Sequence, residues 1–178
     1  MDKFISEVLL SHEEIVRVSE QVGKQISKDY QGKTPILVGL LKGSVPFLAE
    51  LIKHIDIDIE LEFMQASSYK GAESSGTVMV LKDITTSVKG RDLILVEDIV
   101  DTGYTIREIM NLLKDRGANS IEIATLLDKP EGRIVGANVK YIGATIPNKF
   151  VVGFGLDYNE LYRNLNYIGV LKESVYKN

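Results

Sequence analysis

Residues 93–105 of the 178-residue chain read Leu93-Ile94-Leu95-Val96-Glu97-Asp98-Ile99-Val100-Asp101-Thr102-Gly103-Tyr104-Thr105, and they contain the most informative pattern for the fold. Its four leading apolar residues predict a strand that is buried on both faces and ends at Val96. The polar residues that follow predict a loop, and a helix comes next. The apolar side chains of that helix recur at helical spacing and end near Gly117, at Ile106, Ile109, Met110 and Leu113.

The same alternation of strand and helix extends toward the start of the sequence. Ser11 with Glu14 has the pattern of a capping box, which predicts a helix that begins there. Residues 35–41 are an uninterrupted apolar run and predict a second buried strand. After Lys42-Gly43-Ser44 a helix through residues 47–52 is expected. Strands that alternate with helices indicate an α/β fold with a mainly parallel sheet.

Residues 57–63 alternate apolar and acidic side chains, which predicts a half-exposed strand with its acids on the outer face. Residues 77–81 predict an antiparallel partner, and the connection of about 66–76 is far longer than a tight turn. Further strands are expected at 121–127, 139–142 and 150–152. No linker or repeat interrupts the pattern, so we expect residues 1–178 to form a single domain.

Composition excludes several classes of protein. The chain contains no cysteine, so disulfides, thiolate metal sites and a cysteine nucleophile are excluded. No apolar stretch approaches the roughly 20 residues that span a bilayer, and we expect a cytoplasmic protein without a membrane partner. The formal net charge of -4 argues against a dedicated nucleic-acid binder, which needs a basic face.

The chemistry is expected at the carboxyl ends of the strands, where open α/β sheets bind their ligands. Gly103 and the start of the next helix expose backbone N–H groups that suit a phosphate monoester, and Thr102 and Thr105 add hydroxyl donors. Three carboxylates beside a phosphate would repel it if it were bare. They are compatible with a ligand that carries hydroxyls and a Mg²⁺ ion, because Mg²⁺ prefers carboxylate, substrate and water oxygens.

An apolar run, paired acids and Asp-Thr-Gly-x-Thr resemble the signature with which phosphoribosyltransferases bind PRPP (phosphoribosyl pyrophosphate). The resemblance covers nearly the whole chain and is closest to the hypoxanthine-guanine branch. It implies the type I phosphoribosyltransferase fold: a mainly parallel central sheet flanked by helices, a small hood and a long mobile hairpin loop. It also implies purine salvage, in which Mg²⁺-dependent transfer of 5-phosphoribosyl from PRPP to hypoxanthine or guanine gives IMP or GMP and pyrophosphate.

The resemblance assigns the PRPP site to two segments. Glu97 and Asp98 would bind the ribose hydroxyls and the metal. The phosphate loop would cradle the 5-phosphate, and it consists of Asp101, Thr102, Gly103, Tyr104 and Thr105. Tyr104 stands at a variable position and is expected to contribute main-chain groups alone. Asp101 is also the expected general base, which would take a proton from the purine imidazole ring.

Other residues are assigned to the leaving group, the lid and the base. Pyrophosphate would be bound by Lys42, Gly43 and Arg163, and Ser68 with Tyr69 would belong to a lid that excludes water. The purine would be bound by Lys129, Phe150, Val151 and Asp157. Lys129 would donate to the 6-oxygen and reject a 6-amino group, Phe150 would stack on the ring, and Val151 would read the base edge through its main chain. Asp157 would lie near the base or join Glu97 and Asp98 at the metal.

Alternatives remain open at this stage. One is a regulator on the same fold that binds PRPP or nucleotides, although it would need a basic surface stripe or an added DNA-binding segment. Another is a transferase for a different base. Lys129 with the Phe150-Val151 block argues against adenine, orotate and uracil, but xanthine stays open. The family resemblance further implies a homodimer or homotetramer.

Overall fold

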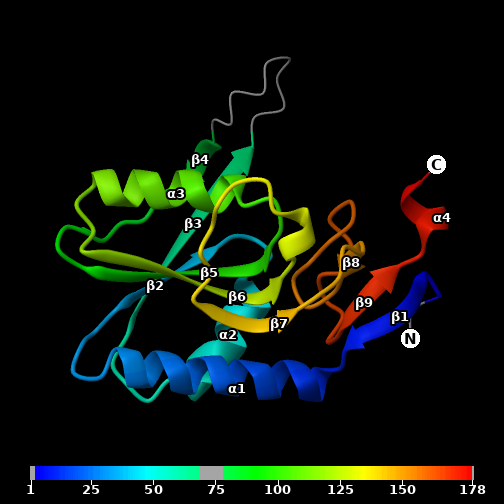
Figure 1. The fold of residues 1–178 in the computed structure, drawn as a ribbon, viewed down its shortest axis with the longest axis horizontal. Coiled ribbons are helices and arrows are strands. Elements are labelled where there is room, and N and C mark those ends of the chain that lie inside the picture. The colour runs from blue at the N-terminus through cyan, green and yellow to red at the C-terminus, as the bar shows by residue number, and fades with distance from the viewer. Residues whose placement is uncertain (1–2, 69–77, 178) are drawn as a thin grey trace.

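The computed structural model describes residues 3–68 and 78–177. A six-stranded sheet with the order β4-β3-β2-β5-β6-β7 forms its centre (Figure 1). All neighbouring strands in it are parallel except β3 and β4, which form the antiparallel hairpin that the sequence predicted. The strands are β2 (Ile36–Leu40), β3 (Glu60–Ser68), β4 (Val78–Lys82), β5 (Asp92–Val100), β6 (Ser120–Asp128) and β7 (Tyr141–Thr145).

Helices cover both faces of the sheet, which explains why β2 and β5 are apolar without interruption. On one face lie α1 (His12–Asp29) and α2 (Val45–Leu51), followed by the short 3-10 helix η1 (Ile52–His54). On the other face lies α3 (Tyr104–Asp115) (Figure 1). In β5, Ile94 and Val96 pack in the core beneath α1 and α2, whereas Leu93 and Leu95 pack beneath α3. The mixed α/β fold with a mostly parallel sheet is therefore confirmed.

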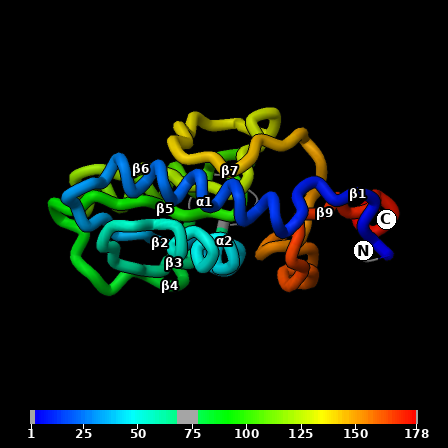
Figure 2. The backbone as a smooth tube through the Cα atoms, turned by 90° about the horizontal axis from the view of Figure 1, so that it is seen from below, coloured from blue at the N-terminus to red at the C-terminus, as the bar shows by residue number. Residues whose placement is uncertain are grey.

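A second, smaller sheet stands at one end of the molecule (Figure 2). Its antiparallel strands have the order β1-β9-β8, with β1 (Ile5–Leu10), β8 (Val151–Val152) and β9 (Ile168–Leu171). We call these strands, the loop 153–167 between β8 and β9, and α4 (Glu173–Tyr176) the hood. The sequence patterns did not predict β1 or β9.

The start of α1 has the predicted capping box. The Ser11 N–H donates to the Glu14 carboxylate at 2.8 Å, and the Glu14 N–H donates to the Ser11 hydroxyl at 3.3 Å. These two bonds satisfy polar groups that a helix terminus otherwise leaves without partners. None of the helices in the described ranges is both long and apolar enough to cross a membrane.

One prediction for β3 is wrong: its acids do not all lie on the outer face. Leu61 is 44% exposed, whereas Glu62 is 8% exposed. The Glu62 carboxylate accepts hydrogen bonds from the Thr85 and Thr86 N–H groups and from the Thr85 hydroxyl. The hydrogen bonds from Thr86 and Thr85 lower the pKa of Glu62 to about 2 despite its burial. Glu62 therefore fixes the segment between β4 and β5 to the sheet.

The predicted end of β5 at Val96 is also wrong. The strand continues to Val100, because Ile99 and Val100 still pair with Leu127 and Asp128 of β6. Glu97 and Asp98 are thus held within a strand rather than in a loop. That placement gives the two carboxylates a fixed backbone on which to project.

Candidate active site

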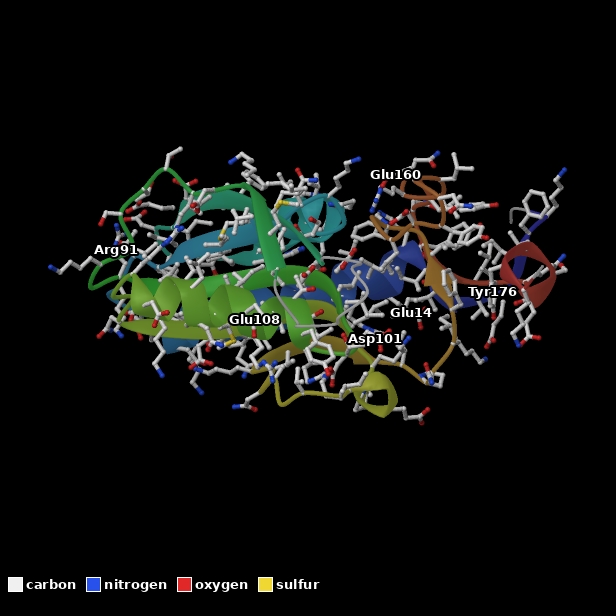
Figure 3. All side chains as sticks on the ribbon, turned by 90° about the horizontal axis from the view of Figure 1, so that it is seen from above. Glu14, Arg91, Asp101, Glu108, Glu160 and Tyr176 are labelled. Carbon is white, nitrogen blue, oxygen red and sulfur yellow. The ribbon has the colours of Figure 1, made fainter. Side chains whose placement is uncertain are left out.

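The carboxyl ends of three adjacent strands bring the predicted site residues to one edge of the sheet. Lys42 follows β2, Asp101 follows β5, and Lys129 follows β6, with the 3-10 helix η2 (Pro130–Gly132) next. Figure 3 shows Asp101 near the end of α3 that faces the hood. The site therefore lies where the main sheet meets the hood.

A cavity of about 170 Å³ lies at the end of β5. It is lined by Glu97, Ile99, Val100, Asp101, Thr102, Gly103, Thr105 and Ile106. Gly103 precedes the first turn of α3 and has a φ of +86°, a conformation that glycine adopts readily. Tyr104 is absent from the lining, and the Arg107 guanidinium lies 5.5 Å from its ring centre. The phosphate loop thus combines a helix N-terminus with two hydroxyls.

Glu97 lines this cavity and forms a pair of adjacent carboxyls with Asp98, the next residue of β5. The Asp98 N–H donates to Glu97 at 3.3 Å, and the Ile99 N–H donates to Asp98 at 2.7 Å. Burial and the neighbouring Asp98 raise the pKa of Glu97 well above its usual range, and burial also raises the pKa of Asp98. In the ranges 3–68 and 78–177, no lysine, arginine or histidine forms an ion pair with either carboxylate.

This pair fits the requirements of a divalent cation, since a cation would offset the repulsion between two neighbouring, half-buried carboxylates. Mg²⁺ commonly takes only one or two protein carboxylates, with substrate and water oxygens in the other positions. Within the described part of the chain, no three acidic or histidine side chains converge as a ready metal cluster. The structure therefore does not join Asp157 to Glu97 and Asp98 as a third ligand.

Asp101 and Lys129 form a close ion pair. The Lys129 ammonium lies 2.6 Å from Asp101 Oδ2, and the Lys129 side chain is only 12% exposed. The Lys129 N–H also donates to the Val100 carbonyl at 3.0 Å, so the start of the η2 turn is tied to the end of β5. The expected base and the expected 6-oxygen donor are thus neighbours.

Arg133, the residue after η2, holds the segments that carry Asp101 and Lys129 together. The sequence patterns did not predict this role. The Arg133 guanidinium donates to the carbonyls of Val100, Asp101 and Ala137 and pairs with Asp128. In the sequence, an arginine that makes buried contacts from a polar loop cannot be told apart from one whose side chain lies in solvent. Only the packing reveals that it holds the phosphate loop.

The segment 41–43, which we call the Lys42 loop, contacts both the acidic pair and the hood. The Leu41–Lys42 peptide is cis, although no proline is present. A side chain at Gly43 would collide with the Asp98 carboxylate. A side chain at Gly155 in the hood would collide with the Gly43 carbonyl. Glycine at both positions lets the Lys42 loop approach the Asp98 carboxylate on one side and the backbone of the hood loop on the other.

Arg163 projects from the hood loop and lies in a cluster of acceptors. Its guanidinium donates to the Gly155 carbonyl at 2.8 Å and pairs with Asp157 at 2.8 Å and with Glu160 at 3.1 Å. Glu160 also pairs with Lys42 at 2.8 Å, and these hydrogen bonds from Lys42 and Arg163 lower the pKa of its carboxyl. The structure therefore brings the two predicted pyrophosphate ligands, Lys42 and Arg163, together through Glu160, to which the sequence patterns gave no role.

Phe150 and Val151 occupy the inner edge of the hood. The Phe150 ring stacks on Tyr176 with centroids 4.7 Å apart and meets Tyr158 edge-on at 5.8 Å. Val151 lies in β8, which is an edge strand of the hood sheet, so one side of its main chain has no partner among the described strands. Of the expected lid, Ser68 ends β3 opposite Val78, and Tyr69 lies outside the described residues, as does most of the loop 66–76.

A parallel sheet with a helix N-terminus, hydroxyls and an acidic pair at its carboxyl edge defines an α/β protein built to bind a phosphorylated ligand. The family model described as "Phosphoribosyl transferase domain" matches residues 6–159. The chain therefore belongs to the phosphoribosyltransferase family.

Individual members of the family are similar to this chain over nearly their whole lengths. A protein named hypoxanthine-guanine phosphoribosyltransferase from Streptococcus pneumoniae strain R6 is 56% identical, covering 100% of this chain and 99% of the relative. Its namesake from Lactococcus lactis is 58% identical, covering 99% and 96%. The crystal structure of a hypoxanthine phosphoribosyltransferase from Staphylococcus aureus superimposes with a TM-score of 0.95 at 50% identity, covering 98% of this chain and 96% of that one.

Proposed function

We propose that this protein transfers the 5-phosphoribosyl group of PRPP to hypoxanthine or guanine, giving IMP or GMP and pyrophosphate in purine salvage. The observation that carries the proposal is the cavity at the end of β5, which is lined by residues of the phosphate loop and by Glu97 of the acidic pair. Full-length similarity to relatives that bear the name of this activity supports it.

PRPP would be bound from both ends of the site. The N–H groups and hydroxyls of residues 101–105 would bind the 5-phosphate, and Glu97 with Asp98 would accept hydrogen bonds from the ribose hydroxyls. Lys42, Gly43 and Arg163 would bind the pyrophosphate. When bound, Mg²⁺ would supply positive charge that neutralises the departing pyrophosphate. Glu97 and Asp98 are the residues proposed to hold it, and Asp157 of the hood loop is a proposed further ligand that would have to move toward them.

The purine would enter beside Lys129. Its ammonium would donate to the 6-oxygen, and Phe150 and Val151 would bind the ring and its edge. The bond from the ribose anomeric carbon to pyrophosphate then breaks, and the bond to purine N9 forms through an oxocarbenium-like centre. Asp101 would accept the proton from N7, so the base does not keep a positive charge. Ser68 and Tyr69 would help to exclude water.

The test is incubation with PRPP, Mg²⁺ and each of five bases: hypoxanthine, guanine, xanthine, adenine and uracil. Nucleotide formation, followed by chromatography, should occur with hypoxanthine and guanine. Product with adenine alone, or with no base, would overturn the proposal. Product mainly with xanthine would redirect it to a xanthine-preferring transferase. A gel shift with DNA or RNA at physiological salt would instead indicate the regulator.

We further propose that the protein acts in the cytoplasm as a homodimer or homotetramer, the states that the family resemblance implies. Large apolar side chains are exposed on the hairpin strands β3 and β4, including Leu61, Met79 and Leu81 at 44%, 50% and 55%. Patches of this kind often mark protein interfaces. Light scattering after gel filtration would give the mass, and a monomer at micromolar concentration would contradict this proposal.

A further inference from the structure

The carboxylate of Glu160 bridges two cations that belong to different parts of the molecule. Glu160 Oε2 lies 2.8 Å from the Lys42 ammonium, and Oε1 lies 3.1 Å from the Arg163 guanidinium. Lys42 follows a strand of the main sheet, whereas Glu160 and Arg163 belong to the hood loop, where Figure 3 shows Glu160. Each oxygen of the Glu160 carboxylate thus contacts one cation. The oxygens of a bound phosphate group can contact two cations in the same way.

The backbone beneath Glu160 is held in an unusual conformation. Asn159, Glu160 and Tyr162 have φ values of +51°, +65° and +75°, the left-handed region that side chains other than glycine seldom adopt. Such conformations persist where the surroundings enforce them, and they cluster at ligand clamps and switch regions. Here the Glu160 N–H donates to Asp157 Oδ2 at 2.9 Å, and this bond helps to turn the carboxylate toward Lys42.

The bridge is exposed and easily exchanged. The side chains of Lys42 and Glu160 are 57% and 63% exposed, and exposed ion pairs contribute little to stability. Arg163 is different: its side chain is 26% exposed, and it keeps the Gly155 carbonyl and Asp157 as acceptors when Glu160 leaves. Glu160 can therefore swing out while Arg163 stays in place and Lys42 becomes available.

We propose that Glu160 is a stand-in for the ligand: its carboxylate occupies the position of pyrophosphate oxygens between Lys42 and Arg163, and pyrophosphate must displace it to bind. This inference rests on the proposed function, which assigns Lys42 and Arg163 to pyrophosphate, and it adds a third residue that tunes the affinity. Glu160 offsets part of the charge of the two cations, since Arg163 also pairs with Asp157, and it competes with the incoming anion for them.

The test is the binding of inorganic pyrophosphate, with and without Mg²⁺, measured by titration calorimetry on three variants of the full chain. Glu160→Gln keeps the shape of the side chain and removes its charge. Glu160→Asp keeps the charge on a side chain that is one methylene shorter. Glu20→Gln is the matched control, since Glu20 of α1 has a side chain that is 46% exposed and whose ion pair, with Lys24 at 2.5 Å, involves no residue proposed for the site.

Glu160→Gln should bind pyrophosphate about 3- to 10-fold more tightly than the unaltered protein, because two exposed ion pairs no longer have to be broken. The gain should be smaller for Glu160→Asp and absent for Glu20→Gln. Unchanged or weaker binding by Glu160→Gln would overturn the inference, since Glu160 would then only position the two cations. Failure of every variant to bind pyrophosphate would refute the proposed pyrophosphate site, and the inference with it.

Discussion

Among single residues, Asp101 is the one whose substitution should separate binding from chemistry. Asp101→Asn retains the shape of the side chain next to Lys129 but cannot accept a proton. Turnover should fall by about 100- to 10,000-fold, the usual contribution of a general base, while PRPP still binds. Steady-state rates and PRPP titration would measure the two effects. Undiminished turnover would exclude Asp101 as the base.

Glu62 allows a test of stability against pH at the residue scale. Its pKa in the folded protein is about 2, below its ordinary value of 4.5, so its ionised form stabilises the fold above about pH 4.5. That contribution must decline as the pH falls toward 2. Glu62→Gln should lower the free energy of unfolding by about 1–3 kcal/mol at pH 7, because a buried charged acceptor of three hydrogen bonds is lost.

The difference in the free energy of unfolding between the unaltered protein and Glu62→Gln should become smaller as the pH is lowered below 4.5. Urea unfolding at pH 7, 5 and 4 would measure it. A gap that is equal at all three values would show that the ionised carboxylate is not what stabilises this segment. No periodic pattern could have predicted this role, because the acidic residues of 57–63 alternate in the same way whichever one is buried.

Among the elements, α1 depends on a cap that the sequence predicts completely. Ser11→Ala removes the hydroxyl that accepts from the Glu14 N–H and should lower the free energy of unfolding by about 1 kcal/mol. Activity should not change, since the helix N-terminus takes no proposed part in binding. Thermal unfolding with an activity assay would check both points, and an unchanged melting temperature would contradict the role of the cap.

The elements also show which structure a sequence can predict. The strands β2 and β5 were recognisable because helices cover both of their faces, which leaves a local apolar run. The hood strands β1 and β9 were not, since they pair with each other across more than 150 positions of the sequence, whereas β8 falls within the strand predicted at 150–152. The same reason explains why the roles of Glu160 and Arg133 were not predicted, since they follow from contacts between distant segments. The phosphate loop was predictable because it is one contiguous motif.

At the scale of the whole molecule, the hood meets the main sheet at Gly155. This residue has a φ of +103°, and its α-carbon faces the Gly43 carbonyl with no room for a side chain. Gly155→Ala should push the hood loop away from the Lys42 loop. Pyrophosphate binding should weaken by more than about tenfold, and the free energy of unfolding should fall by about 1–3 kcal/mol.

The matched control is Gly90→Ala, since Gly90 also has a positive φ, of +72°, but a β-carbon at this position would meet no atom of the described residues within 4 Å. It should reproduce part of the loss of stability and none of the loss of binding. Calorimetry and thermal unfolding of both variants would separate backbone strain from collision. Equal pyrophosphate affinities in the two variants would show that the contact at Gly155 does not shape the site.

The pairing of β1 with β9 has a consequence for how the protein is made. The Ser6 hydroxyl donates to the carbonyl of Val170, a residue 164 positions later. A ribosome adds roughly 5–20 residues per second, so β1 waits on the order of ten seconds or more for its partner. During that time it is an unpaired strand edge, which can attract other nascent chains. The charged Glu7 on its exposed face would discourage such pairing until translation reaches β9.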